Sequence, residues 1–190
     1  MVKPLLRAIL KYQLVLFFLF LAGGGAIKAQ EQERAPEIRG SAWFNAGAYK
    51  KINNKALLGK VVLIFFWTSN DTNCDSAART LNEWYSRYKS KGFEIIGVNS
   101  PEWQFDSSAS AIFSKIDILN IKFPVVIDED SYMRTAYAQQ MWPSFCLIDR
   151  DGYIRARYKG FYTYREIEKM LKALLEERAA QVRLRRDSKI

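Results

Sequence analysis

The stretch that decides the fold of this chain is Val61-Val62-Leu63-Ile64-Phe65-Phe66-Trp67-Thr68-Ser69-Asn70-Asp71-Thr72-Asn73-Cys74. Its first seven residues form an unbroken run of β-branched, aliphatic and aromatic side chains, which is typical of a strand covered on both faces. From Asp71 to Tyr88 apolar residues recur at spacings of three and four, which predicts a helix, and Gly92 follows as its stop. The stretch therefore predicts a buried strand that leads directly into a helix.

Strand and helix signals alternate on both sides of this stretch. The last two strands are separated by Asp149-Arg150-Asp151-Gly152, whose Asp-Gly pair favours a hairpin turn. This order predicts an α/β domain with a mixed sheet and helices on both faces. Strands are expected at 42–45, 93–98, 123–127, 144–148 and 153–158, and helices at 107–119, 131–139 and 164–180, with a brief helical turn that ends at Gly59.

The segment from Val61 to Cys74 resembles the strand, tryptophan and helix start of the periplasmic redoxins. These are thioredoxin-like thiol–disulfide oxidoreductases that include the soluble domains of cytochrome c maturation proteins. In that family a Trp is followed, four and seven residues later, by the two cysteines of a C-x-x-C motif. Counting from Trp67, Cys74 falls on the second cysteine and Asp71 stands at the first. The resemblance implies a thioredoxin fold.

Three further motifs agree with this alignment, and the resemblance spans about residues 40–178. The stretch 97–102, Gly-Val-Asn-Ser-Pro-Glu, looks like the family's strand ending in a loop carboxylate beside the redox site, which implies that role for Glu102. Trp142-Pro143 is similar to the family's cis-proline, which lies against the C-x-x-C motif. The stretch 147–152 matches the strand and turn that follow. We therefore expect a cis Trp142–Pro143 bond close to Cys74.

The departure at position 71 decides what chemistry the site supports. The family's first cysteine is the exposed nucleophile, and a helix N-terminus stabilises its thiolate. Asp71 suits the same electrostatic position because a carboxylate at a helix start caps free amides, but it forms no disulfide. Cys74 alone has no resolving partner in the motif. Dithiol exchange is therefore expected to be lost, or reduced to one-thiol chemistry at Cys74, and the catalytic candidates are Cys74, Asp71 and Glu102.

The candidate binding residues are tryptophans and the proline around this site. Trp67 ends the buried strand, and Trp103 and Trp142 flank the expected site beside Pro143. A structural role is the alternative for each tryptophan, because large aromatic residues most often fill a core. Together they are also able to form an apolar binding surface.

The second cysteine and the absence of histidine limit the disulfides, metal sites and catalytic chemistry that the chain is able to form. Cys146 alternates with Phe145 and Leu147, so it is expected in the core, and its strand leads it away from Cys74. We therefore expect no disulfide between them. Because the chain has two cysteines and no histidine, neither a metal site nor a cofactor is expected, and Ser-His, Cys-His and zinc-hydrolase chemistry are excluded.

The N-terminus carries the pattern of an export segment. Three cations precede an apolar run at 14–22, and small residues follow up to Ala29, which predicts a signal peptide over 1–29. An uncleaved membrane anchor is the alternative. Residues 30–40 are expected as a linker, 41–180 as the thioredoxin-like domain and 181–190 as a basic tail. The expected location is the periplasm or cell envelope.

The net charge does not indicate nucleic-acid binding. Of the formal charge of +9, residues 1–29 contribute +4 and the last thirteen residues another +4, so the body between them is nearly neutral. A nucleic-acid binder needs a basic face on the folded domain itself. The expected partner is instead a cell-envelope protein or a thiol-containing peptide, with membrane contact if the N-terminal segment is uncleaved.

Three functions remain open from the sequence. The first is a divergent redoxin that keeps one-thiol chemistry at Cys74, which would require an exposed thiol with a lowered pKa. The second is a non-catalytic module that holds an extended peptide in a groove beside Pro143. The third, peroxidase activity of the peroxiredoxin type, is weaker, because the stretch 68–71 offers the required Thr but ends in Asp, and no Pro precedes it.

Overall fold

The protein, described here from a computed structural model, is built on one six-stranded mixed sheet with the strand order β1-β4-β3-β2-β5-β6. The structure describes residues 32–47, 52–100 and 108–187. At the centre lie β2 (Val61–Trp67) and β3 (Phe93–Asn99), which are parallel and buried at every position, as their continuous apolar sequences require. The strand predicted from the deciding stretch has the bounds observed for β2. The α/β class and the mixed sheet are confirmed.

The strands around this parallel centre make the sheet mixed. β4 (Val125–Ile127) is parallel to β3, whereas β1 (Trp43–Phe44), β5 (Ser144–Ile148) and β6 (Ile154–Lys159) each run antiparallel to a neighbour. The helices are α2 (Asn54–Leu57), α3 (Thr72–Tyr88), α4 (Ala109–Ile118), α5 (Tyr132–Ala136) and α6 (Tyr164–Asp187). Short 3₁₀ turns lie at Lys89–Lys91 and Phe161–Thr163.

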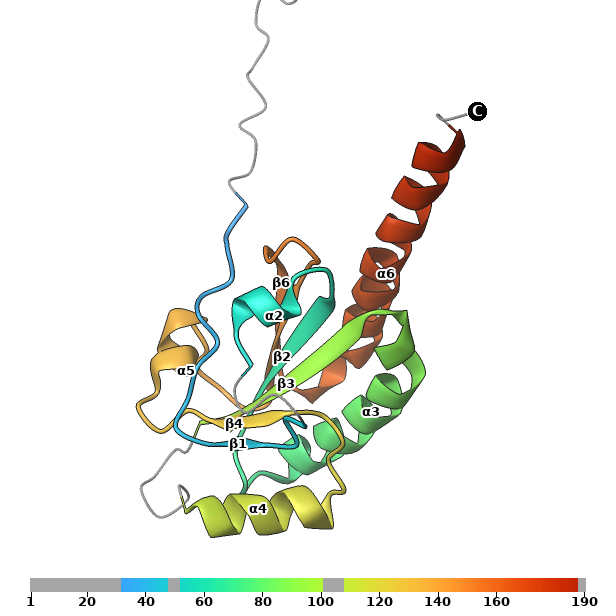
Figure 1. Ribbon diagram of the computed structural model, residues 1–190. Helices are drawn as coiled ribbons and strands as arrows, with labels where there is room; N and C mark the ends of the chain where they lie inside the picture. The colour runs from blue at the N-terminus through green and yellow to red at the C-terminus, as the bar shows by residue number, and fades with distance from the viewer. Residues whose placement is uncertain (1–31, 48–51, 101–107, 188–190) are drawn as a thin grey trace, which may run out of the picture. The chain divides into compact units, whose positions relative to one another are not determined.

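The helices cover both faces of the sheet, as Figure 1 shows. One face packs against α3, α4 and α6, with Leu63, Phe65 and Trp67 of β2 pointing into that core. The other face packs against α2 and α5, with Val62, Ile64 and Phe66 pointing there. The period-2 alternation of a strand produces this division, and it assigns every β2 side chain to one of two cores.

The segment expected as a linker packs on the domain from residue 32 onward. Ile38 is buried, its amide donates to Asn54 Oδ1 at 2.8 Å, and Asn54 Nδ2 donates to the carbonyl of Pro36 at 2.8 Å. The amide of Ala35 donates to the carbonyl of Gly152 at 2.9 Å. The compact unit therefore begins at Gln32, earlier than the expected boundary at residue 41, because an apolar side chain and satisfied backbone groups hold this polar segment.

One helix boundary and the pairing beside one turn differ from the sequence expectations. The last helix, expected to end near residue 180, continues to Asp187. The predicted turn between β5 and β6 is present, with Gly152 at φ 86°, and the pairing shifts register next to Leu147 and Ile148. The shift leaves Arg155 as an extra residue in β6, which is the arrangement of a β-bulge. We call the end of the sheet with this turn the hairpin end.

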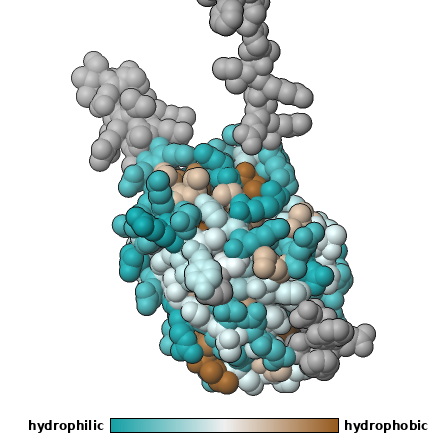
Figure 2. Space-filling view, turned by 180° about the vertical axis from the view of Figure 1, so that it is seen from behind, coloured by the Kyte–Doolittle hydropathy of each residue, from teal (hydrophilic) through white to brown (hydrophobic). Residues whose placement is uncertain are grey.

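The described part of the surface carries few large apolar side chains. Leu58, Phe113, Ile118 and Met141 are exposed, and Figure 2 shows that hydrophobic colour forms only small separate patches on the face it presents. Within the part of the chain that the structure describes, none of the helices is both long enough and apolar enough to span a membrane.

Candidate functional site

The loop after β2 places Asp71 at the start of α3. Asp71 is the N-cap, and its Oδ1 accepts hydrogen bonds from the amide of Asn73 at 2.6 Å and from that of Cys74 at 3.4 Å. An N-cap carboxylate satisfies amides that have no partner within the helix, and its charge is favourable at the positive end of the helix dipole. The sequence predicted this capping role. The chain thus supplies its own anion at the position that a thiolate would occupy.

Cys74 lies in the first turn of α3 and is fully buried in the core that α3 and α6 share. Burial raises the pKa of its thiol to about 12, a backbone hydrogen bond with Thr68 acts in the opposite direction, and the charges of Asp71 and Asp75 raise the pKa further. Lys115 forms an ion pair with Asp75 at 2.8 Å. Because a thiolate is the reactive form of cysteine, this environment disfavours nucleophilic chemistry at neutral pH.

The Trp142–Pro143 peptide bond is cis, as predicted. Pro143 is buried and immediately precedes β5, where Ser144 pairs with Phe66 of β2, and its carbonyl accepts from the amide of Gly160 at 2.9 Å. This register sets Pro143 beside the carboxyl end of β2, from which the chain leads to Asp71. We call this edge of the sheet the cis-proline end. It lies opposite the hairpin end because β5 runs from one to the other.

The two described tryptophans of the predicted binding set differ in their surroundings. Trp67 is fully buried and stacks on Phe65, with ring centroids 6.2 Å apart, so it belongs to the core. Trp142 is only partly buried; it packs against the same core, and the Arg134 guanidinium lies over its ring at 5.0 Å. Glu102 and Trp103 lie outside the described residues.

Polar side-chain atoms without partners gather at the cis-proline end, a feature that the sequence reasoning missed. Among the described residues, no hydrogen-bond partner is present for either amide atom of Asn99, for the indole N–H groups of Trp67 and Trp142, or for the hydroxyls of Thr68 and Ser144. All of these atoms are buried. Buried polar groups are rarely left unpaired, and when they are, a bound ligand or water is a frequent reason.

Cys146 lies on the other face of the sheet from Cys74. It packs with Ile64 and Tyr137 in the core against α5, whereas Cys74 belongs to the core against α3. Both cysteines are free thiols in this structure. In the described part of the chain, no group of three or more His, Cys, Asp or Glu side chains is arranged to hold a metal ion.

Comparison with known proteins agrees with this geometry. The model of the AhpC/TSA family matches residues 32–157. The chain belongs to the AhpC/TSA family.

Two curated relatives match most of this chain. The thiol–disulfide oxidoreductase ResA of Bacillus anthracis is 33% identical over 125 residues, which cover 66% of this chain and 69% of ResA. Protein DipZ of Mycobacterium tuberculosis is 33% identical over 161 residues, or 84% of this chain. The match covers only 23% of DipZ, so this chain corresponds to about a quarter of that protein.

Solved structures show the fold independently. A thioredoxin-like protein in its oxidised form has a TM-score of 0.68 at 24% identity, over 77% of this chain and 97% of the other. A thiol–disulfide isomerase from Corynebacterium glutamicum has a TM-score of 0.64 at 23% identity, over 74% of this chain and 96% of the other. The predicted thioredoxin-like fold and redoxin family are therefore confirmed.

Proposed function

We propose that this AhpC/TSA family member is a cell-envelope protein that has lost dithiol–disulfide exchange and uses its cis-proline end to bind extended polypeptide. The observation that carries the loss is the pair formed by Asp71 and Cys74. Asp71 occupies the first-cysteine position as a helix cap, and the single thiol of the motif is fully buried with its pKa raised to about 12. The export pattern of residues 1–29 supports the location.

The lost step is identifiable from the chemistry of exchange. A thiolate must attack a substrate disulfide and form a mixed disulfide, and a second thiol must then displace the bound sulfur. Asp71 has no sulfur for the first step. Cys74 has no neighbouring thiol for the second, since Cys146 lies across the sheet. One-thiol chemistry at Cys74 is the weaker alternative, because the sulfur is inaccessible and protonated at neutral pH.

Polypeptide binding is supported by what remains at the cis-proline end. Trp142 is partly exposed, and Met141 beside it is 45% exposed, so an apolar contact is available next to Pro143. The unpartnered groups of Ser144 and Asn99 lie at the same end of the sheet. Because both of those polar side chains are buried, the exposed apolar surface of Met141 and Trp142 is what a polypeptide would contact first.

The loss of exchange is tested by the reduction of insulin with dithiothreitol as electron donor. The unmodified chain is expected to give the background rate, and Asp71→Cys to give a rate at least about tenfold higher, since it restores the attacking thiol at a helix N-terminus. Asp71→Ser is the matched control, because it keeps a capping side chain without sulfur. Clear turnover by the unmodified chain that Cys74→Ser abolishes would overturn the proposal.

The proposed polypeptide binding is tested with fluorescently labelled, reduced and carboxymethylated α-lactalbumin, which is unfolded and has no thiols. Trp142→Ala should weaken its binding at least about fivefold, because the side chain supplies a large apolar contact. Leu58→Ala is the control, since Leu58 is an exposed apolar side chain, at 55%, that lies at the hairpin end. Equal binding by both variants, or none by the parent, would contradict the binding role.

A further inference from the structure

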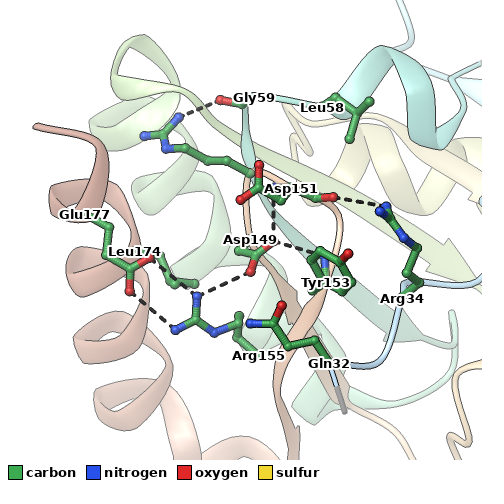
Figure 3. A pocket seen from close by; sticks show the side chains of 11 residues that line it. Gln32, Arg34, Leu58, Gly59, Asp149, Asp151, Tyr153, Arg155, Leu174 and Glu177 are labelled. Atoms are coloured by element: carbon green, nitrogen blue, oxygen red, sulfur yellow. Dashed lines mark hydrogen bonds and ion pairs between the residues drawn. The ribbon is translucent and has the colours of Figure 1, made fainter. Parts of the chain in front are cut away.

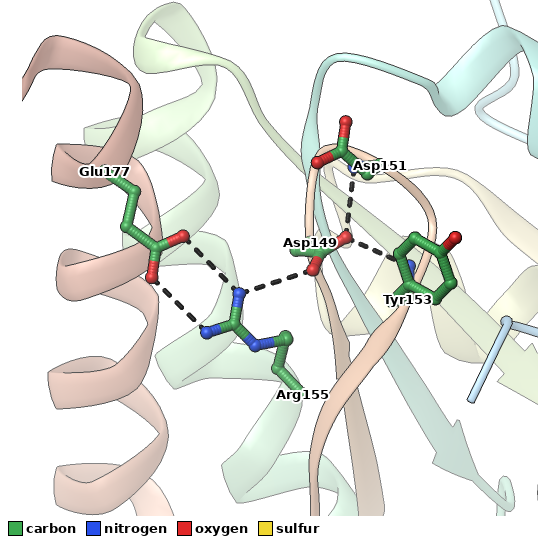
Figure 4. Close-up of polar contacts among 5 residues, drawn as sticks. All are labelled: Asp149, Asp151, Tyr153, Arg155 and Glu177. Atoms are coloured by element: carbon green, nitrogen blue, oxygen red, sulfur yellow. Dashed lines mark hydrogen bonds and ion pairs between the residues drawn. The ribbon is translucent and has the colours of Figure 1, made fainter. Parts of the chain in front are cut away.

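At the hairpin end, the guanidinium groups that line a cleft of about 770 Å³ all have acceptors within the protein (Figure 3). Arg34 donates to the carbonyl of Asp151 at 3.4 Å. Arg155 donates to Asp149 Oδ2 at 3.3 Å and to both carboxylate oxygens of Glu177 at 3.4 Å, so it joins the β5–β6 turn to α6 (Figure 4). Among the residues described for this cleft, no guanidinium is therefore left to meet an anionic ligand.

Two other arginines lie over aromatic rings, and only one of them pairs with an acid of the chain. Arg39 Cζ lies 3.9 Å from the centroid of the Tyr132 ring, and Arg39 Nη2 donates to Asp130 Oδ2 at 3.0 Å. Arg134 Cζ lies 5.0 Å from the centroid of the Trp142 ring. Among the described residues, no acceptor is found for any of the five N–H donors of the Arg134 guanidinium. Arg134 thus has the aromatic contact of Arg39 without its carboxylate.

The backbone of Arg134 is held by a buried carboxylate. Asp128 is fully buried, and its Oδ2 accepts from the amide of Arg134 at 2.9 Å and from Ser100 Oγ at 2.8 Å. The carbonyl of Arg134 accepts from the amide of Gln139 at 2.8 Å. These bonds fix the origin of the side chain, and the contact with Trp142 restricts its far end. A side chain that is ordered before binding loses less conformational freedom when a ligand binds.

This guanidinium lies beside the apolar contact of the cis-proline end. Trp142 and Arg134 are both partly exposed, and Met141, next to Trp142 in sequence, is 45% exposed. The apolar ring and the cation are separated by 5.0 Å. In an extended chain, side chains two positions apart point to the same side and lie about 7 Å from each other. One such pair of side chains is therefore able to contact the indole of Trp142 and the guanidinium of Arg134 together.

We infer, on the basis of the polypeptide binding proposed above, that Arg134 selects extended chains with an acidic residue two positions from an apolar one. A guanidinium forms paired N–H···O bonds with a carboxylate while it stacks on an aromatic ring. The carboxylate of the ligand takes the place beside Arg134 that Asp130 has beside Arg39. The apolar residue of the ligand packs on Trp142 and Met141. Arg134 is therefore a specificity-determining residue of the cis-proline end.

The test measures the binding of two short fluorescein-labelled peptides by fluorescence anisotropy, one with Leu-Ser-Glu and one with Leu-Ser-Gln in the same glycine–serine chain. The unmodified full chain should bind the Glu peptide about fivefold more tightly at low salt, as expected for a partly exposed ion pair. High salt should bring this ratio of affinities toward one. Arg134→Gln should abolish the ratio, whereas Arg134→Lys should keep part of it, because an ammonium retains the charge but not the paired bonds.

Arg39→Gln is the matched control, because it removes the same charge from an arginine that also lies over an aromatic ring but already has an acid. It should leave the ratio unchanged. If α-lactalbumin binds but the unmodified chain does not prefer the Glu peptide, or if Arg134→Gln keeps the preference or Arg39→Gln loses it equally, this inference alone is overturned. If neither peptide nor carboxymethylated α-lactalbumin binds, the proposed function is overturned with it. Far-ultraviolet circular dichroism of each variant separates a lost contact from a lost fold.

Discussion

At the hairpin end of the sheet, the central carboxylate has every partner it needs. Asp149 accepts from the amides of Asp151 and Tyr153, both at 3.0 Å, and from Arg155, which Glu177 holds from the other side. At the cis-proline end the reverse holds. Among the described residues, Asn99, Ser144 and the indole of Trp142 have buried polar atoms with no partner. The hairpin end of the sheet therefore has a fully paired central carboxylate, whereas the cis-proline end has a group of unpaired polar atoms.

The difference separates structural polar groups from candidate functional ones. A buried polar group that is fully paired stabilises the native state, whereas an unpaired one costs stability and persists where something else favours it. By this criterion the cleft of about 770 Å³ that Arg34, Asp149 and Glu177 line at the hairpin end is structural. The cis-proline end has the unpaired groups and, at its surface, Met141 and Trp142, which are the side chains available for ligand contact.

The largest expected effect concerns the thiol at the cis-proline end. A rise in pKa from the ordinary value of 9.0 to about 12 lowers the thiolate fraction of Cys74 at pH 7 about a thousandfold, and burial also blocks access. Native Cys74 should therefore react with iodoacetamide at least about a thousand times more slowly than in urea, by peptide mapping with mass spectrometry. A native rate within tenfold of the unfolded rate would restore Cys74 as a reactive group.

The same shift gives a pH dependence whose sign is fixed. The folded state holds the proton of Cys74 more tightly than the unfolded state does, so this contribution to stability is complete below pH 9 and is lost as the pH rises toward 12. A site that stabilises the thiolate would lower the pKa of its cysteine, and the free energy of unfolding would then rise with pH. The free energy of unfolding is expected to fall over this range.

Sequence reasoning was accurate where local pattern and family motif agree. The bounds of β2, the capping role of Asp71 and the cis bond before Pro143 follow from residues close together in the chain. The unpaired state of Asn99 does not follow from nearby residues. It depends on which strands and loops, distant in sequence, pack around its amide. The contact of Arg155 with Glu177 depends likewise on a register shift that no local signal in the sequence marks.

The satisfied network at the hairpin end predicts a loss of stability when it is broken. Asp149→Ala should lower the free energy of unfolding by about 3 kcal/mol, because it leaves two backbone amides without their acceptor and removes one of the two carboxylates that Arg155 contacts. Asp151→Ala is the control: Asp151 is exposed, and the contacts found for it are made by its backbone amide and carbonyl. Urea denaturation of both variants measures the difference. Equal losses would mean that the network contributes nothing beyond ordinary turn propensity.

The smallest expected effect compares two asparagines that differ in pairing. Asn82 donates to the carbonyls of Leu119 and Asn120 and accepts from the amide of Lys122, whereas Asn99 is 1% exposed and has no partner among the described residues for either amide atom. Asn82→Ala should therefore cost about 1.5 kcal/mol in urea denaturation. Asn99→Ala should change stability by less than about 0.5 kcal/mol, because the lost packing is offset by removal of an unpaired buried amide.

The two substitutions delete the same atoms, so side-chain size does not account for a difference between them. If Asn99→Ala is as costly as Asn82→Ala, the amide is already paired in the free protein, by ordered water or by a neighbouring segment, and it is not available to a ligand. If it is neutral in stability but weakens the binding of carboxymethylated α-lactalbumin, the amide belongs to the binding surface. That outcome would extend the polypeptide site from Trp142 across the sheet to β3, since Asn99 ends that strand beside Trp67.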